Sequence, residues 1–405
     1  MEAMAAIGTR AVRQWNILRE LVFPGHLDEG RLRSALATAA AVNPFARARR
    51  EITANGDWRW KIDAGLSVNA LSVLDTATPG SDAILRELQA ERLCADAGPA
   101  FRCFLVRSPN GDRLVFNFCH ERTDGIGAMA FLVSLQRAYL GASEASCGDE
   151  WIARRYASEL TATPNLAPPG LFQPESISHL AAEPTQAVRT DDTHVVRLFF
   201  TSSELLKMRQ PLSGQSVTVM HRVVAAASIA AAHWNRAHGE HADRICVSVP
   251  VNARPKEWVK EGFFGRFGTM FINSSPAERL TMESAVNSVT GQARLMIPLA
   301  KAMADGFARP APAAVMPNSP ATPIPNAIVP TVAVSSLGAW EIGAFGNAGP
   351  VLKVWAPPLA QPPMGVALGV LSLNGQLLVS LRFAEAMIGR PGALRFAESF
   401  RALCL

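Results

Sequence analysis

Three residues close together in the sequence, His120, Asp124 and Gly125, could carry out acid–base chemistry. Imidazole has an unperturbed pKa of about 6.5, so it can accept a proton near neutral pH. Asp124 lies where a helix is expected to begin, and a carboxylate there can cap the helix and fix the preceding loop. Gly125 allows a substrate or another backbone to approach closely, and amides at a helix start favour a developing oxyanion. The segment predicts general-base catalysis by His120, with a purely structural histidine as the ordinary alternative.

Two strands and a helix are expected to position this segment. Residues 100–107 and 113–119 alternate as strands do, and residues 108–112 between them have the composition of a turn. This pattern predicts an antiparallel hairpin. Residues 125–140 then carry apolar side chains at helical spacing. His120 therefore lies between a strand end and a helix start, which would hold its ring in one direction.

The rest of the chain predicts helices and strands in mixed order, which is typical of an α+β fold with mixed sheets and flanking helices. The further expected helices are 27–42, 81–94, 218–234, 282–300 and 391–405. The further expected strands are 58–62, 193–200, 244–251, 331–334 and 365–383, and the last contains an Asn-Gly hairpin turn. A region rich in Pro, Ser and Asn predicts a linker between two halves. We expect an N-terminal half at 1–162, a linker at 163–192 and a C-terminal half at 193–405.

Composition excludes several classes of protein. The chain has 405 residues, of which 49% are hydrophobic and 18% charged, so it is too apolar to be disordered. Its net charge is +5 without a basic stripe interleaved with aromatics, which disfavours nucleic-acid binding. The longest apolar run, 223–232, is too short to cross a bilayer. The six dispersed cysteines have no CxxC spacing and predict neither a metal site nor a redox site. With no signal peptide at the start, we expect free thiols and a cytoplasmic protein.

An ordered set of motifs resembles the chloramphenicol acetyltransferase-like superfamily of CoA- or carrier-protein-dependent acyltransferases. This superfamily includes condensation domains, polyketide-associated acyltransferases and wax ester synthase-type enzymes. Its signature H-H-x-x-x-D-G is similar to residues 119–125, where Cys119 replaces the first histidine. Weaker matches follow the family order: G-x-L-D at 25–28, H-P-x-L-R at 43–47, P-V-N-x-R at 249–254, F-G-N at 264–266 with Arg266 for Asn, and S-N-x-x-G at 334–338 with Ser336 for Asn.

The resemblance implies a fold, a reaction and roles for single residues. The fold would be two chloramphenicol acetyltransferase-like halves that form a V with a tunnel at their interface. His120 would be the base, and Asp124 would be structural and paired with an arginine, for which Arg254 is the candidate. The oxyanion would be stabilised by Gly125 N–H or by a hydroxyl of Ser335 or Ser336.

The resemblance also implies the reactants. No cofactor or metal would be resident, and acyl-CoA or a phosphopantetheinyl thioester would be the co-substrate. The acceptor would be a small molecule with a hydroxyl or amine, in secondary metabolism or lipid esterification, and an acyl or peptidyl carrier protein is an expected partner. Three departures from the family pattern, Cys119, Arg266 and Ser336, keep an alternative open: a catalytically lapsed protein that only binds a carrier protein or biosynthetic partner. A cyclisation reaction, the acceptor's identity and ester against amide formation also stay open.

Overall fold

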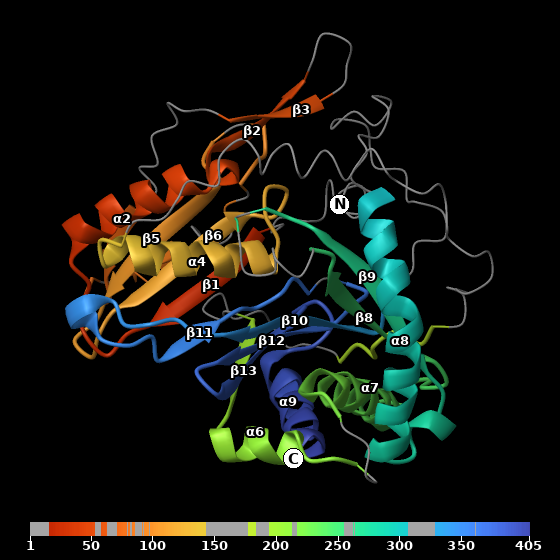
Figure 1. Ribbon diagram of the computed structural model, residues 1–405. Coiled ribbons are helices and arrows are strands. Elements are labelled where there is room, and N and C mark those ends of the chain that lie inside the picture. The colour runs from red at the N-terminus through yellow and green to blue at the C-terminus, as the bar shows by residue number, and fades with distance from the viewer. Residues whose placement is uncertain are drawn as a thin grey trace.

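The computed structural model describes residues 16–52, 58–62, 71–142 apart from 79, 82, 86–90, 92 and 97, 177–183, 194–212, 217–254, 262, 264–306, 329–360 and 362–405. These residues form two lobes side by side, each a β-sheet with helices packed against it (Figure 1).

The first lobe is a five-stranded sheet in the order β11-β1-β6-β5-β4. Its strands are β1 (Asn16–Val22), β4 (Leu71–Asp75), β5 (Phe101–Arg107), β6 (Arg113–Cys119) and β11 (Lys353–Trp355). Helices α2 (Glu29–Val42) and α4 (Gly125–Tyr139) pack on it and on each other, and a separate hairpin is formed by β2 (Ala48–Ile52) and β3 (Trp58–Ile62). Buried phenylalanine rings of β5, β6 and α4 fill its core: Phe101, Phe116, Phe118 and Phe131.

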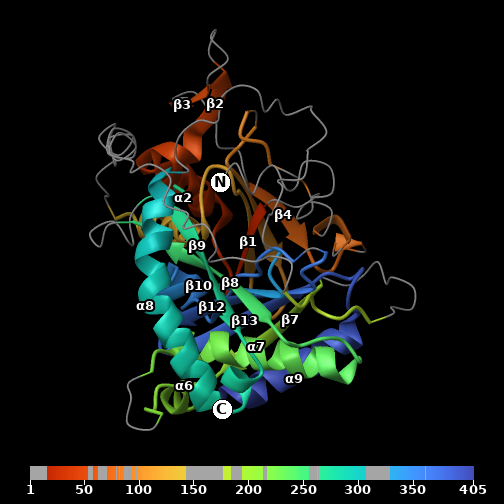
Figure 2. The same cartoon turned by 90° about the vertical axis from the view of Figure 1, so that its right-hand side faces the viewer.

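The second lobe is a six-stranded sheet in the order β7-β13-β12-β10-β8-β9. Its strands are β7 (Val195–Phe200), β8 (Ile245–Asn252), β9 (Phe267–Ser274), β10 (Val332–Trp340), β12 (Val366–Leu373) and β13 (Gln376–Phe383). Its helices are α6 (Ser202–Met208), α7 (Val219–Ala237), α8 (Met282–Gly306) and α9 (Arg390–Cys404). Figure 2 shows α8 running along the edge strand β9, where the two elements are in contact. β10 runs parallel to both β8 and β12, whereas the other neighbouring strands are antiparallel, so the sheet is mixed.

The two lobes are interlocked by the chain. After β10 the chain enters the first lobe, and β11 pairs antiparallel with β1 there. Leu337, Trp340 and Phe345 of this segment belong to the buried core of the first lobe. The expected linker, 163–192, lies outside the described residues except for 177–183, whose backbone hydrogen-bonds to the second lobe. The predicted boundaries therefore stay predictions, but part of the predicted C-terminal half completes the first sheet.

The α+β prediction is confirmed, and most expected elements are present within a few residues of their predicted bounds. The hairpin at Asn374-Gly375 has positive φ at both residues (49° and 79°), as a tight hairpin turn requires. The helix expected at 81–94 was too long, because Leu93 and Cys94 are irregular and Leu93 N donates to Asn16 Oδ1 at 3.3 Å.

Two further expectations concern membrane-spanning helices and the state of the cysteines. Within these residues no helix is long and apolar enough to cross a membrane. All five described cysteines are free thiols, and four of them are buried.

Candidate active site

His120 lies in a tight turn directly after β6. The Cys119 carbonyl accepts hydrogen bonds from Arg122 N at 3.1 Å and Thr123 N at 3.3 Å, which closes the turn. β6 is paired along its length with β1 on one side and β5 on the other, and Cys119 N donates to Ala100 O at 2.8 Å. The backbone that leads to the imidazole is therefore anchored on both sides.

Asp124 is the N-cap of α4 and holds the two lobes together at this point. Its Oδ1 accepts from Gly127 N at 2.8 Å, which is the expected cap, and from Arg254 Nη2 at 2.9 Å. Its Oδ2 accepts from Arg254 Nη1 and from Arg266 N, both at 2.8 Å. A carboxylate with four donors around it is fully occupied, so Asp124 positions the loop and has no free lone pair directed at a substrate.

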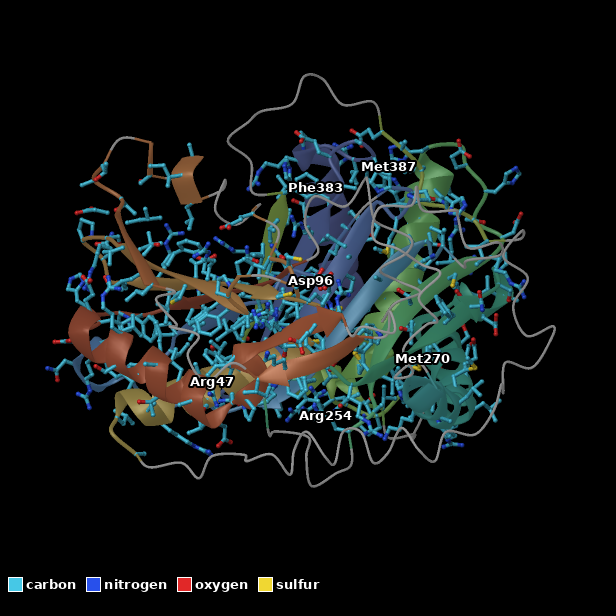
Figure 3. All side chains as sticks on the ribbon, turned by 90° about the horizontal axis from the view of Figure 1, so that it is seen from above. Arg47, Asp96, Arg254, Met270, Phe383 and Met387 are labelled. Atoms are coloured by element: carbon cyan, nitrogen blue, oxygen red, sulfur yellow. The ribbon has the colours of Figure 1, made fainter. Side chains whose placement is uncertain are left out.

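Arg254 follows β8 and comes from the second lobe, and Figure 3 places it where the two lobes meet. Its guanidinium forms a bidentate pair with Asp124, donates to Phe264 O, and lies 4.4 Å from the centroid of the Phe264 ring. Asp124 is 4% exposed and Arg254 is 3% exposed. The structure thus brings together the two residues for which the resemblance implied a structural pair.

The charge of Asp124 is maintained despite its burial. Burial by itself raises the pKa of Asp124, but the Arg254 guanidinium and the N–H groups of Gly127 and Arg266 outweigh it and hold the pKa below 3.8. The carboxylate is therefore ionised at neutral pH. Arg266 contacts Asp124 through its backbone N–H, so this contact does not depend on the side chain at that position.

The His120 imidazole lies between the lobes. Its ring centroid is 6.0 Å from that of Phe267, the first residue of β9. Its Nδ1 is buried, whereas the residue as a whole has intermediate exposure. Burial lowers the pKa of His120 below 6.5, and the nearby Arg19 guanidinium lowers it further, whereas backbone hydrogen bonds and Asp124 act in the opposite direction. The lowered pKa favours the neutral ring at pH 7, which is the form that can accept a proton.

Cys119, at the position of the family's first histidine, points away from the site. Its thiol is buried and its Sγ donates to Leu93 O at 3.4 Å. Burial, together with Glu121, raises the pKa of this thiol to about 12, so it is not a nucleophile at neutral pH. Cys119 therefore packs beside Leu93 and Ala95 and hydrogen-bonds to the Leu93 backbone.

Arg122 is a residue that sequence reasoning missed. Its side chain is fully buried and donates from Nη2 to the carbonyl oxygens of Cys94, Ala95 and Gly98 at 3.0 to 3.1 Å. It ties the turn of His120 to the segment before β5. No periodic pattern marks a charged residue inside an irregular loop, so the only available signal was its place in the motif.

The expected oxyanion donors lie on two neighbouring elements. Gly125 is the first residue of α4, and a Cβ atom at this position would be 2.5 Å from Leu337 Cδ2. Ser335 and Ser336 directly precede Leu337 in β10 and have intermediate exposure. The structure therefore brings the β10 segment against the start of α4, and the roles of Gly125, Ser335 and Ser336 stay predictions.

We expect Gly127→Ala to destabilise the fold by about 1–3 kcal/mol, because the added methyl group overpacks the lobe interface. Its Cβ would lie 2.3 Å from Thr123 Oγ1 and 2.4 Å from Phe264 O. Gly291→Ala on α8 is the matched control, since it is exposed, has no described atom within 4 Å of its Cβ, and should stabilise by up to ~1 kcal/mol. Urea unfolding measures both, and equal stabilisation by the two substitutions would contradict the tight packing at Gly127.

The described residues contain no group of three or more His, Cys, Asp or Glu that could hold a metal ion. His238, at the end of α7, makes contacts within that helix. Nδ1 of His238 is 2.8 Å from Trp234 O, and its ring lies against the Trp234 ring with centroids 4.1 Å apart. This histidine therefore belongs to the helix end.

Comparison with known proteins identifies relatives along almost the whole chain. No protein-family model matches. Two proteins of Mycobacterium tuberculosis, uncharacterized protein Rv2305 of strain H37Rv and uncharacterized protein MT2362 of strain CDC 1551, are each 27% identical to it over 93% of this chain and 91% of their own.

Solved structures share the architecture at low identity. A trichothecene 15-O-acetyltransferase from Fusarium sporotrichioides has a TM-score of 0.67 and 14% identity, covering 100% of this chain and 93% of that one. The first condensation domain of the calcium-dependent antibiotic synthetase has a TM-score of 0.67 and 16% identity, covering 99% and 93%. The starter condensation domain of rhizomide synthetase, in complex with C8-CoA and Leu-SNAC, has a TM-score of 0.65 and 14% identity, covering 100% and 92%. The chain therefore has the two-lobed condensation-domain fold that its motifs predicted.

Proposed function

We propose that this protein is an acyltransferase that moves an acyl group from a CoA or carrier-protein thioester to a hydroxyl or amine, with His120 as general base. The observation that carries the proposal is His120, a residue of intermediate exposure with a lowered pKa, whose ring lies between the two lobes on a loop fixed by the Asp124–Arg254 pair. Two proteins of the same fold point to this donor, because one is an O-acetyltransferase and the other was solved with C8-CoA.

The chemistry follows from these groups. A thioester is an activated acyl donor, so direct attack needs a base, an oxyanion donor and orientation. His120 takes the proton of the acceptor O–H or N–H as that atom attacks the thioester carbonyl. The carbonyl oxygen becomes negative in the tetrahedral intermediate, and we propose that Gly125 N–H or a hydroxyl of Ser335 or Ser336 stabilises it. The C–S bond then breaks, the thiolate leaves, and the imidazolium returns its proton to the sulfur.

The setting of the reaction is part of the proposal. The free thiols among the described cysteines fit a reducing compartment, and we propose that the protein acts in the cytoplasm. An acyl or peptidyl carrier protein is the proposed macromolecular partner if the donor is a carrier thioester. Secondary metabolism and lipid esterification are the two proposed settings, and they differ in the acceptor.

An acceptor and donor panel tests the function. The protein is incubated with acetyl-, octanoyl- and palmitoyl-CoA and with an octanoyl-loaded carrier protein, each with an alcohol and an amine acceptor, and products are identified by mass spectrometry. We expect an ester or amide from at least one pair and none from His120→Gln. A protein that forms a stable complex with the carrier protein but releases no thiol and makes no product from any pair is the lapsed binding protein instead.

A further inference from the structure

Arg19 is a buried cation that lies beneath the start of α4. It is on β1, opposite Phe116 of β6, and it is only 3% exposed. It faces the same side of the strand as Ile17 and Leu21, which belong to the apolar core of the first lobe. A guanidinium on the core side of a strand is unusual because a charge in an apolar interior has a large desolvation penalty.

The contacts of Arg19 are to neutral backbone groups. Nη1 donates to Leu18 O at 2.7 Å, and Nη2 donates to Gly125 O at 3.1 Å. Among the described residues, no carboxylate is within ion-pair distance of Arg19, and its buried Nε has no hydrogen-bond partner. A Cβ at Gly125 would be 3.1 Å from Nη2, so the glycine leaves room for this approach. The bond joins β1 directly to the first residue of α4.

Arg19 gives the buried group that it forms with Asp124 and Arg254 an excess positive charge. Asp124 is already neutralised by its bidentate pair with Arg254, so the Arg19 charge has no anion of its own there. Burial lowers the pKa of Arg19 to about 9, against the opposing influence of Asp124, and the group therefore stays charged at neutral pH. Keeping an uncompensated buried charge is destabilising, which suggests that it serves the site rather than the stability of the fold.

We propose that Arg19 is a positioning residue for His120: it holds the first turn of α4 through the Gly125 carbonyl and places a fixed buried positive charge beneath the loop that carries the imidazole. This inference rests on the proposed acyl transfer for its use, but its physical content concerns His120 alone. Because the first peptide of α4 is planar, fixing the Gly125 carbonyl also fixes the direction of the next N–H group.

The other charged groups around His120 do not replace Arg19. Asp124, from the helix start, favours the imidazolium form and so opposes Arg19. Arg254, from the second lobe, has its guanidinium committed to Asp124, whereas Arg266 donates only its backbone N–H to that carboxylate. Neighbouring Glu121 is 3.8 Å from Arg50, and Arg122 is committed to backbone carbonyls. Burial is the largest cause of the lowered pKa of His120, and Arg19 is a cation that adds to it, so its removal should raise the proton affinity of His120.

The test is an NMR titration of the His120 ring, with its resonance assigned by its loss in His120→Gln. In Arg19→Met the midpoint should move upward by about half a pH unit or more, because a nearby like charge is removed. Arg19→Lys keeps the charge and should titrate close to the wild type. Arg33→Met, which removes a surface cation of α2 whose side chain is 43% exposed, is the control and should cause no movement.

The outcomes separate this inference from the proposed function. If Arg19→Met does not fold, Arg19→Gln is compared with Arg19→Lys in the same way, and only the neutral substitution should shift the midpoint. A folded neutral variant that titrates like the wild type overturns the inference, whether or not the protein transfers acyl groups. A shifted titration in a protein that makes no product keeps the inference and rejects the function. Where activity is found, the acidic limb of the rate profile should move to higher pH in Arg19→Met.

Discussion

Replacing His120 with glutamine should lower kcat for acyl transfer by roughly 10²–10⁴-fold, the usual contribution of a general base. Glutamine has a similar reach and can hydrogen-bond, but it cannot accept a proton at neutral pH. Because His120 has intermediate exposure and lies in a turn closed by backbone bonds, the substitution should change the free energy of unfolding by less than about 1 kcal/mol. KM should change little, since the loss is confined to the transition state.

The measurement is steady-state release of free thiol with the best donor and acceptor pair, with unfolding followed in parallel. His238→Gln is the matched control, because its ring lies at the end of α7 against Trp234. That control should keep the wild-type kcat. A folded His120→Gln protein with wild-type turnover would exclude His120 as the base.

Replacing Arg254 with methionine should destabilise the protein by about 3–5 kcal/mol, because it leaves the Asp124 carboxylate buried without its counter-ion. The pair is 3% and 4% exposed and joins the end of β8 to the start of α4, so its loss weakens the contact between the lobes. Substituting both partners, as in Asp124→Asn with Arg254→Met, should be less destabilising than the sum of the single changes, since the stranded charge is then absent.

Urea unfolding at neutral pH measures these free energies. The surface pair Arg33–Glu29, whose side chains are 43% and 42% exposed, is the control, and Arg33→Met should change stability by no more than ~1 kcal/mol. If Arg254→Met is no more destabilising than Arg33→Met, the pair does not hold the lobes together.

Local features of the site could be predicted from the sequence. The β5–β6 hairpin has alternating strands around a turn, and α4 has helical spacing with a capping aspartate, so each is encoded within a few residues. His120 and Asp124 follow from the same segment. The Asp124–Arg254 contact joins residues 130 positions apart and was expected only from a resemblance, not from spacing.

Features that depend on distant pairing could not be predicted. β11 has three residues, too few for a pattern, and forms because β1 offers it an edge. Phe267 reaches His120 only through the arrangement of the two sheets. β9 alternates between buried and less buried residues and could have been recognised as a strand. Arg19 was also recognisable in the sequence, because a charged residue between Ile17 and Leu21 interrupts the apolar face of β1.

The most direct measurement of the central claim is the single-turnover rate of acyl transfer as a function of pH, between about pH 5 and pH 8, in the wild type and in His120→Gln. A base must be unprotonated to act, and the folded-state pKa of His120 is lowered, so the wild-type rate should hold at neutral pH and fall through one ionisation below 6.5. In His120→Gln that ionisation should vanish along with most of the rate. An identical acidic limb in both proteins would contradict the assignment of His120 as the proton acceptor.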